Sequence, residues 1–220
     1  MNAPAAIIEA HPAPAGDTLI LGDEDRARAH HYALLARLFF AAPDAPLLAA
    51  LAASARVMGD GDSPFARAWA ELGECAEQAD ASALRDEYDA LFYGIGRPDV
   101  MLYGSWYLAG FLMEEPLAEL RDDLAELGLA RRAGVAETED HIAALAEVMR
   151  HLALTGPDEA GLARQRRFFV RHLQPWYARL ADALAAAPQA RFYARTGALM
   201  RAFFDIESEA FAMEQGAAGH

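Results

Sequence analysis

Apolar residues recur along most of the chain at the three- and four-residue spacing of an amphipathic helix. In the stretch 23–41 they fall at Ala27, Leu34, Leu35, Leu38 and Phe39, which share one face of a helix. Prolines, glycines and capping residues divide the rest into similar stretches. The pattern predicts eight or nine helices, at about 23–41, 46–57, 63–79, 80–93, 105–128, 138–154, 158–173, 175–187 and 189–213, with Pro116 either kinking the fifth or restarting it.

The composition supports the same fold class. Alanine supplies 52 of the 220 residues, whereas valine, isoleucine and threonine together number 15. Helices favour Ala, Leu, Arg and Glu, and strands favour β-branched residues. We therefore expect an all-α protein, a globular helical bundle, and neither a β-sandwich nor a parallel α/β sheet. No repeat of 30–50 residues is visible, which disfavours a solenoid.

The two ends of the chain lack a sustained helical period. We interpret residues 1–22 as a flexible tail, 23–213 as a single helical domain and 214–220 as a second tail. The first residues carry no basic group, and their apolar runs are too short for a signal-peptide core. No later stretch has the roughly 20 apolar residues that cross a bilayer. A soluble protein that stays where it is made is expected.

Charge and missing residue types exclude several functions. The net charge of −14 disfavours binding to nucleic acid or to an anionic membrane. All 19 basic residues are arginine, so a P-loop lysine and a Schiff-base lysine are impossible. Cys75 is the only cysteine in the sequence, which rules out an internal disulfide and a thiolate metal site within one chain.

Motifs for metal or nucleotide binding are weak. Glu137 with His141 and Glu147 with His151 are helical i, i+4 pairs, which we interpret as surface neighbours rather than metal ligands. No glutamate is followed by histidine at the third position, as a di-iron bundle would need. The segment from Gly94 begins like a dinucleotide fingerprint, but it follows a predicted helix and is interpreted as a helix stop and loop. We expect neither a metal nor a cofactor.

A nucleophilic site is equally weak. Ser105 could be paired with His141 and Asp140, but adjacent residues of a helix point about 100° apart, so this aspartate is badly placed to orient that imidazole. Ser105 also has an ordinary interpretation as a helix cap. No catalytic residue is predicted.

Two groups of residues remain. The first is a set of aromatic side chains around the break at 94–104: Tyr88, Phe92, Tyr93, Tyr103, Trp106, Tyr107 and Phe111. We expect Phe92 and Phe111 to belong to the core. The other aromatic residues suit a half-open groove. The second is the run 137–141, Glu-Thr-Glu-Asp-His, at the start of a predicted helix. Capping of that helix explains the acids, and a binding site is an equally good explanation for the run as a whole.

These motifs, in this order, resemble the TorD/DmsD/NarJ family of chaperones that mature molybdenum enzymes. They are residues 87–94 (Glu-Tyr-Asp-Ala-Leu-Phe-Tyr-Gly), 103–107 (Tyr-Gly-Ser-Trp-Tyr), 115–116 (Glu-Pro) and 139–141 (Glu-Asp-His). The resemblance runs from about Arg26 to Phe211. Two residues depart from it. Family members often have proline where this chain has Leu102, and proline or another small residue where it has Glu139.

The resemblance implies a fold and a function. The fold is a helical body of two lobes, here about 23–112 and 137–213, joined at a hinge. The function is that of a non-enzymatic cytoplasmic chaperone, a monomer or a lobe-swapped dimer. It binds the twin-arginine signal peptide of an apo-molybdoenzyme until the molybdopterin cofactor is inserted. The residues that it implies for signal-peptide binding are Tyr88, Phe92, Tyr103, Ser105, Trp106, Tyr107, Glu115, Asp140 and His141.

The second half of the chain is most similar to the members associated with formate dehydrogenases. Its motifs are residues 165–169 (Gln-Arg-Arg-Phe-Phe) and His172-x-x-Pro175-Trp176. Two alternatives stay open. One is an enzyme that acts on a small ligand or hydrolyses a nucleotide in the same cleft. The other is a structural adaptor whose aromatic residues all belong to its core.

Overall fold

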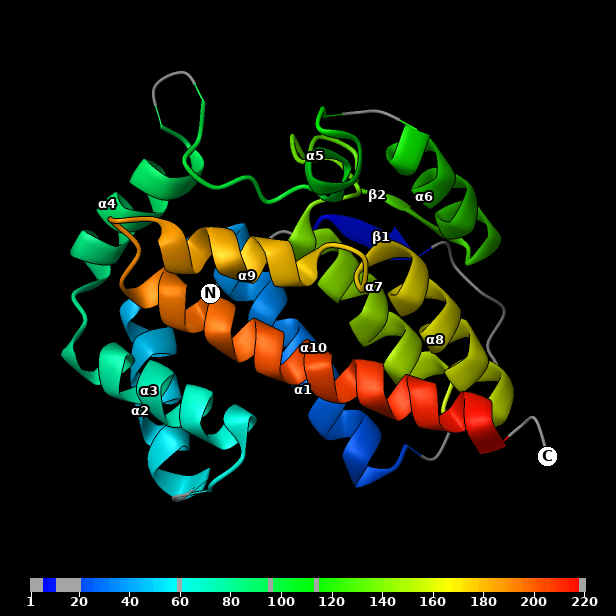
Figure 1. Cartoon of the computed structure of the whole chain (residues 1–220), viewed down its shortest axis with the longest axis horizontal. Coiled ribbons are helices and arrows are strands. Elements are labelled where there is room, and N and C mark those ends of the chain that lie inside the picture. The colour runs from blue at the N-terminus through cyan, green and yellow to red at the C-terminus, as the bar shows by residue number, and fades with distance from the viewer. Residues whose placement is uncertain (1–5, 11–20, 59–60, 95–96, 113–114, 218–220) are drawn as a thin grey trace. The chain divides into compact units, whose positions relative to one another are not determined.

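The computed structural model describes residues 6–10, 21–58, 61–94, 97–112 and 115–217. This part of the chain is almost entirely helical, which confirms the all-α prediction (Figure 1). Its helices are α1 (Asp23–Phe40), α2 (Ala45–Met58), α3 (Pro64–Gln78), α4 (Ala81–Phe92), α5 (Gly104–Ala109), α6 (Glu115–Glu126), α7 (Ile142–Thr155), α8 (Glu159–His172), α9 (Tyr177–Ala186) and α10 (Phe192–Ala217). Two short strands, β1 (Ile8–Ala10) and β2 (Leu129–Arg131), pair with each other.

The chain divides into two compact units, each built from two separate stretches. Unit 1 comprises residues 1–40 and 102–176, and unit 2 comprises residues 41–101 and 177–220. This division differs from the predicted lobes 23–112 and 137–213. The reason is helix pairing: α1 packs against α7, so the start of the chain joins unit 1, while α10 packs against α3 and α9 in unit 2.

Unit 1 is organised around α7. All five residues from Ile142 to Ala146 are buried, although a helix at a surface would bury only one stripe. Two neighbouring helices, α1 and α8, pack against α7. Tyr32 and Phe39, both fully buried, are among the large side chains that α1 contributes to this core. The start of α7, which carries a predicted site, is therefore fixed by the unit's core.

The N-terminal segment contradicts the prediction of a flexible tail over 1–22. Ile8, Glu9 and Ala10 pair antiparallel with Arg131, Ala130 and Leu129, as Figure 1 shows for β1 and β2. Ile7 is fully buried and Ile8 is 8% exposed, so burial of two isoleucines holds the segment in unit 1. The rest of that predicted tail, except residues 6, 21 and 22, lies outside the described residues.

Unit 2 is a second helical body, in which α3 packs against both α2 and α10. Glycines allow two of its helices to approach their neighbours: a Cβ added at Gly73 would lie 2.1 Å from the Cβ of Ala55, and one added at Gly197 would lie 2.8 Å from a methyl carbon of Leu184. The last helix, α10, continues to Ala217, so the tail predicted over 214–220 begins with helix. Residues 218–220 lie outside the described part.

The stretch 105–128, predicted as a helix that Pro116 either kinks or restarts, forms two helices. Gly110 has a φ of 83°, a left-handed conformation that favours glycine and ends α5. Pro116 is the second residue of α6, so it restarts the helix rather than kinking it. The described residues therefore contain ten helices, against the eight or nine that the sequence predicts.

Candidate functional site

Two predicted site segments, 35 residues apart in the sequence, meet at the start of α5 and the start of α7. Tyr103 and His141 form an isolated antiparallel bridge. The N–H of Gly104 donates to the carbonyl of Asp140 at 2.9 Å, and the N–H of Ile142 donates to the carbonyl of Leu102 at 2.8 Å. The backbone thus connects the two motifs directly within unit 1.

Asp140 fixes the start of α5 through its side chain. Its Oδ2 accepts hydrogen bonds from the N–H of Ser105 at 2.9 Å and from the Ser105 hydroxyl at 2.5 Å. Its Oδ1 accepts from the Thr138 hydroxyl at 2.6 Å. Asp140 is only 3% exposed. This carboxylate is thus engaged by three donors of its own chain, and Ser105 is not the helix cap that the sequence predicts, since Tyr103 occupies that position.

His141 has a structural task at the start of α7. It is the N-cap residue, and its Nδ1 accepts a hydrogen bond from the N–H of Ala143 at 3.1 Å. The ring packs edge-on against Tyr103, with centroids 5.1 Å apart. Burial lowers the pKa of His141 to about 3, so the imidazole is neutral at physiological pH.

The acids before His141 do not cap a helix, because α7 begins only at Ile142. The predicted helix start at Thr138 is therefore wrong. Glu139 instead forms ion pairs with Arg121 at 3.0 Å and with Arg131 at 3.7 Å. These contacts connect the segment before α7 to α6 and β2.

Trp176 packs against α5, and it was not identified from the sequence as a site residue. Its ring stacks on Tyr107, with centroids 5.3 Å apart and planes 16° apart. Its indole N–H donates to the carbonyl of His172 at 2.6 Å. A Cβ added at Gly104 would lie 3.1 Å from this indole nitrogen, so the glycine permits the close approach. A glycine directly before the helix predicted over 105–128 is the signal that was available.

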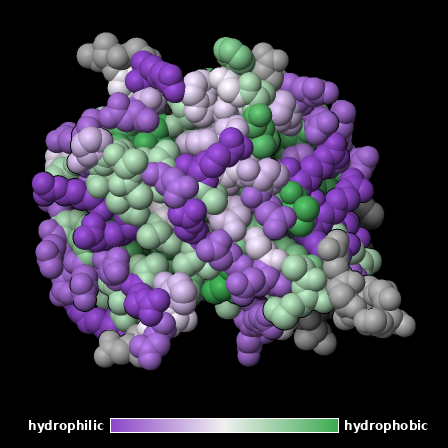
Figure 2. Space-filling view, viewed as in Figure 1, coloured by the Kyte–Doolittle hydropathy of each residue, from purple (hydrophilic) through white to green (hydrophobic). Residues whose placement is uncertain are grey.

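The end of α5 presents large apolar side chains to solvent. Leu108 is 40% exposed, Phe111 is 68% exposed and Leu112 is 39% exposed. The prediction that Phe111 belongs to the core is wrong. On the face that Figure 2 shows, hydrophilic residues are widespread and hydrophobic ones form small separate groups. Because α5 packs against the acidic helix α6, which begins at the exposed Glu115, apolar and acidic groups occur together here. We call Leu108, Phe111, Leu112 and Glu115 the α5 surface.

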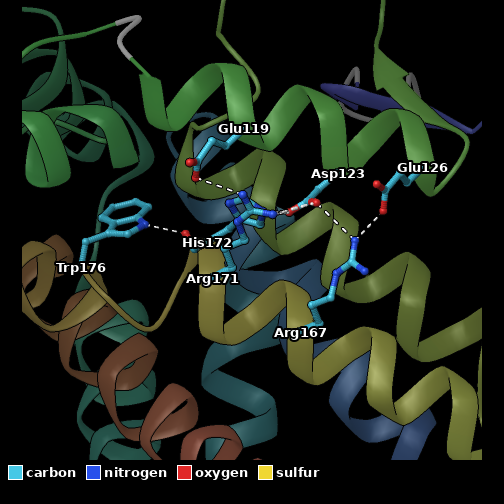
Figure 3. A network of polar contacts seen from close by, with 7 residues as sticks. All are labelled: Glu119, Asp123, Glu126, Arg167, Arg171, His172 and Trp176. Carbon is cyan, nitrogen blue, oxygen red and sulfur yellow. Dashed lines mark hydrogen bonds and ion pairs between the residues drawn. The ribbon is translucent and has the colours of Figure 1, made fainter.

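A polar network, unassigned by sequence reasoning, joins α6 to α8 (Figure 3). At its centre is Asp123, which is 6% exposed. Arg171 donates from Nη1 to both carboxylate oxygens of Asp123, at 2.9 and 3.0 Å, and His172 Nε2 lies 2.6 Å from Oδ2. Arg167 contacts Asp123 at 3.3 Å and Glu126 at 2.5 Å, and Arg171 also pairs with Glu119 at 3.2 Å.

The network holds Asp123 in its charged form. Burial alone would raise the pKa of this carboxyl, but hydrogen bonding and the charges of His172, Arg171 and Arg167 outweigh burial and leave the pKa below its usual value. The ring of His172 contacts Asp123, and the backbone carbonyl of His172 accepts a hydrogen bond from the indole N–H of Trp176. The network therefore continues to Trp176, on which Tyr107 of α5 stacks.

The remaining predicted residues, Tyr88 and Phe92, belong to α4 in unit 2. They are 5% and 7% exposed, and both pack against Tyr193, at centroid distances of 5.5 and 5.0 Å. Burial raises the pKa of the Tyr193 hydroxyl. In the structure these two aromatic residues are core residues of unit 2.

Glu87, the first residue of the predicted Glu-Tyr-Asp motif, caps α10. Its Oε1 accepts from the N–H groups of Arg191 and Tyr193, both at 2.9 Å. We expect Glu87→Ala to lower the free energy of unfolding by about 1–2 kcal/mol, because two amides at the helix start lose their acceptor. Urea unfolding measures this change. Asp86→Ala, at the exposed neighbouring position, is the control, and equal effects of the two variants would contradict the capping role.

The Ser105–Asp140 bond gives a second prediction. Ser105→Ala should lower the free energy of unfolding by about 1.5–3 kcal/mol, because a buried carboxylate loses one of its donors. Ser54, whose hydroxyl donates to the carbonyl of Leu51 at 2.9 Å, is the matched control. Its alanine variant should cost about 0.5–1.5 kcal/mol, the range of an ordinary hydrogen bond. A Ser105→Ala effect no larger than that of Ser54→Ala would contradict the role of Asp140.

The same geometry bears on the enzyme alternative. The Ser105 hydroxyl donates to Asp140, and the Nδ1 of His141 is occupied by a backbone amide. The two residues are therefore not arranged as a nucleophile with its base. Among the described residues, no group of three or more histidines, cysteines and acids is arranged to hold a metal ion. Their helices also include none that is both long and apolar enough to cross a membrane.

Comparisons with known proteins identify the family. The sequence profile of the family described as nitrate reductase delta subunit matches residues 59–182, more than half of the chain. No protein of curated function matches the sequence. Among solved structures, the chain is similar to a protein from Archaeoglobus fulgidus whose proposed role is redox enzyme maturation. The two are 20% identical with a TM-score of 0.55, over 88% of this chain and 99% of that chain, which shows a shared fold. The chain belongs to the nitrate reductase delta subunit family, which is the NarJ/TorD type of chaperone family.

Proposed function

We propose that this chaperone binds the twin-arginine signal peptide of a molybdoenzyme precursor at the α5 surface. The observation that carries the proposal is the exposure of Leu108, Phe111 and Leu112 beside an acidic helix. A twin-arginine peptide combines two guanidinium groups with a weakly apolar stretch, so its binding site needs apolar and acidic groups together. Contiguous exposed apolar side chains commonly mark interaction sites.

The predicted site residues divide into two roles under this proposal. Trp106, Tyr107 and Tyr103, all half-buried, line the site together with the exposed Glu115. Asp140, His141 and Ser105 are buried and engaged with their own chain, which supports a positioning role beneath the peptide. Tyr88 and Phe92 are left in the core of unit 2.

Charge supports both recognition and encounter. Carboxylates form charge-assisted hydrogen bonds to arginine in a two-pronged geometry that lysine does not reproduce. The net charge of −14 accelerates the approach of a basic segment. We infer that the precursor is held in the cytoplasm until its molybdopterin cofactor is inserted, and that its enzyme is a formate dehydrogenase. The family membership supports the role as a chaperone, and the resemblance of residues 165–169 and 172–176 to members associated with formate dehydrogenases supports the choice of enzyme.

Calorimetric titration of the full chain with twin-arginine signal peptides tests the proposal. We expect one peptide to bind selectively, and the same peptide with both arginines changed to lysine to bind far more weakly. No binding of any such peptide to folded protein would overturn the proposal. Substrate turnover abolished by a change in the same surface would instead favour the enzyme alternative.

A variant pair tests the location. We expect Phe111→Ser combined with Leu112→Ser to abolish peptide binding without loss of helical content, because both side chains are already exposed in the free protein. The matched control is Val57→Ser, since Val57 is an apolar residue of unit 2 that is 86% exposed. Equal weakening by the control would argue against a site at α5.

A further inference from the structure

The edge of β2 and the side chain of Glu147 together bind the chain's own N-terminal segment. One carboxylate oxygen of Glu147, Oε2, accepts from the N–H groups of Ile7 and Ile8, each at 2.8 Å. The N–H of Arg132 donates to the carbonyl of Ile7 at 2.8 Å, and the β1–β2 pairing follows. The sequence had suggested that Glu147 and His151 are surface neighbours, whereas Glu147 is half-buried and contacts this strand.

These hydrogen bonds engage the backbone of the segment rather than its side chains. The amides of Ile7 and Ile8, the carbonyl of Ile7 and the strand ladder are groups that other extended peptides also possess. Binding of this kind is strand addition, in which the main chain supplies affinity and side-chain pockets supply selectivity. Here the selectivity comes from burial of Ile7 and Ile8 and from an ion pair between Glu9 and Arg132 at 3.7 Å.

Few residues attach β1 to the rest of unit 1. The strand is three residues long, and a two-stranded ribbon is only marginally stable by itself. Residues 11–22 join the strand to α1, so a segment that left the site would return to it as a tethered ligand, at an effective concentration on the order of millimolar. A free peptide at micromolar concentration therefore does not displace the chain's own segment as long as that segment can bind the site.

We propose that β2 and Glu147 form a strand-acceptor site whose occupant is exchangeable. The ligand class is an extended peptide with two consecutive branched apolar residues followed by an acid. In the free protein, residues 6–10 fill the site and protect the strand edge. This proposal does not depend on signal-peptide binding, because its ligand contains no arginine and its site lies on β2 and α7.

The first experiment uses a full-length variant in which the segment is dislodged, Ile7→Asp with Ile8→Asp. The probe is a fluorescent synthetic peptide with the sequence of residues 3–10, and binding is followed by anisotropy. We expect saturable binding to this variant and none to the wild type at the same micromolar concentrations. Adding Glu147→Ala should weaken binding by about tenfold, the loss expected when charge-assisted hydrogen bonds are removed.

A probe with both isoleucines changed to aspartate is the matched control and should not bind. A variant that keeps its helical content yet fails to bind the original probe would overturn the proposal. Unchanged affinity after Glu147→Ala would overturn it as well.

Hydrogen exchange of the wild type tests exchangeability without any variant. The amides of Ile7 and Ile8 should exchange through local opening, at a lower free energy than the amides in the middle of α7. Equal protection of the two sets would show that the strand leaves only on global unfolding, and would overturn the proposal.

Discussion

Replacing Asp123 by alanine should lower the free energy of unfolding by about 2–3 kcal/mol. Asp123 is a buried carboxylate that contacts Arg171, His172 and Arg167 within 2.6–3.3 Å (Figure 3). Its removal leaves the buried ring of His172 without its acceptor, whereas Arg171 and Arg167 are 44% and 62% exposed and keep Glu119 and Glu126 as partners. Urea unfolding, followed by circular dichroism, measures the loss.

Glu126→Ala is the matched control for Asp123→Ala. Glu126 lies on the same helix as Asp123, and its carboxylate also pairs with Arg167. Glu126 is exposed, however, and exposed ion pairs contribute little to the free energy of unfolding. Asp123→Asn should recover part of the loss, because its amide oxygen still accepts a hydrogen bond. Similar stabilities of the Asp123 and Glu126 alanine variants would show that the network does not stabilise unit 1.

The second large effect is a loss of stability on mild acidification, caused by His141. Burial holds its folded-state pKa at about 3, while an exposed histidine has a pKa of about 6.5. Below pH 6.5 the unfolded chain therefore takes up a proton that the folded chain refuses. The contribution to stability is complete above pH 6.5 and falls as the pH drops, by about 1.4 kcal/mol per pH unit.

His141→Asn isolates this contribution. Asparagine is a good N-cap residue that can accept the Ala143 amide and does not titrate. Between pH 7.5 and pH 5, the free energy of unfolding of the wild type should fall by about 2 kcal/mol more than that of the variant. Parallel pH profiles of the two proteins would contradict a buried, neutral His141.

The sequence predicted the helices well because their signals are local. Periodic apolar residues, Ser63 before Pro64 and the Thr155-Gly156-Pro157 stop each act within a few residues, and α3 and α7 begin or end there as expected. The grouping of helices into units was not predictable in this way. It depends on which helices pack against α7 and α10, and several of these helices are far from them in the sequence.

The candidate site shows the same limit. The motifs at 103–107 and 139–141 were expected to lie together, and the Ser105–Asp140 contacts bring them together. Their role was not apparent from residue type, because an aspartate and a histidine can bind a ligand or hold their own backbone. Asp140 and His141 do the latter. Phe111 was assigned to the core from its aromaticity alone, whereas its exposure depends on Gly110 ending α5.

Hydrogen exchange on the full chain, with and without a bound twin-arginine signal peptide, tests directly whether the peptide binds at the α5 surface. We expect slower exchange of amides in 103–112 when the peptide binds, and no such slowing with the version in which lysine replaces both arginines. Binding without any change in 103–112, or the same change with the lysine version, would contradict the assignment of the α5 surface as the signal-peptide site.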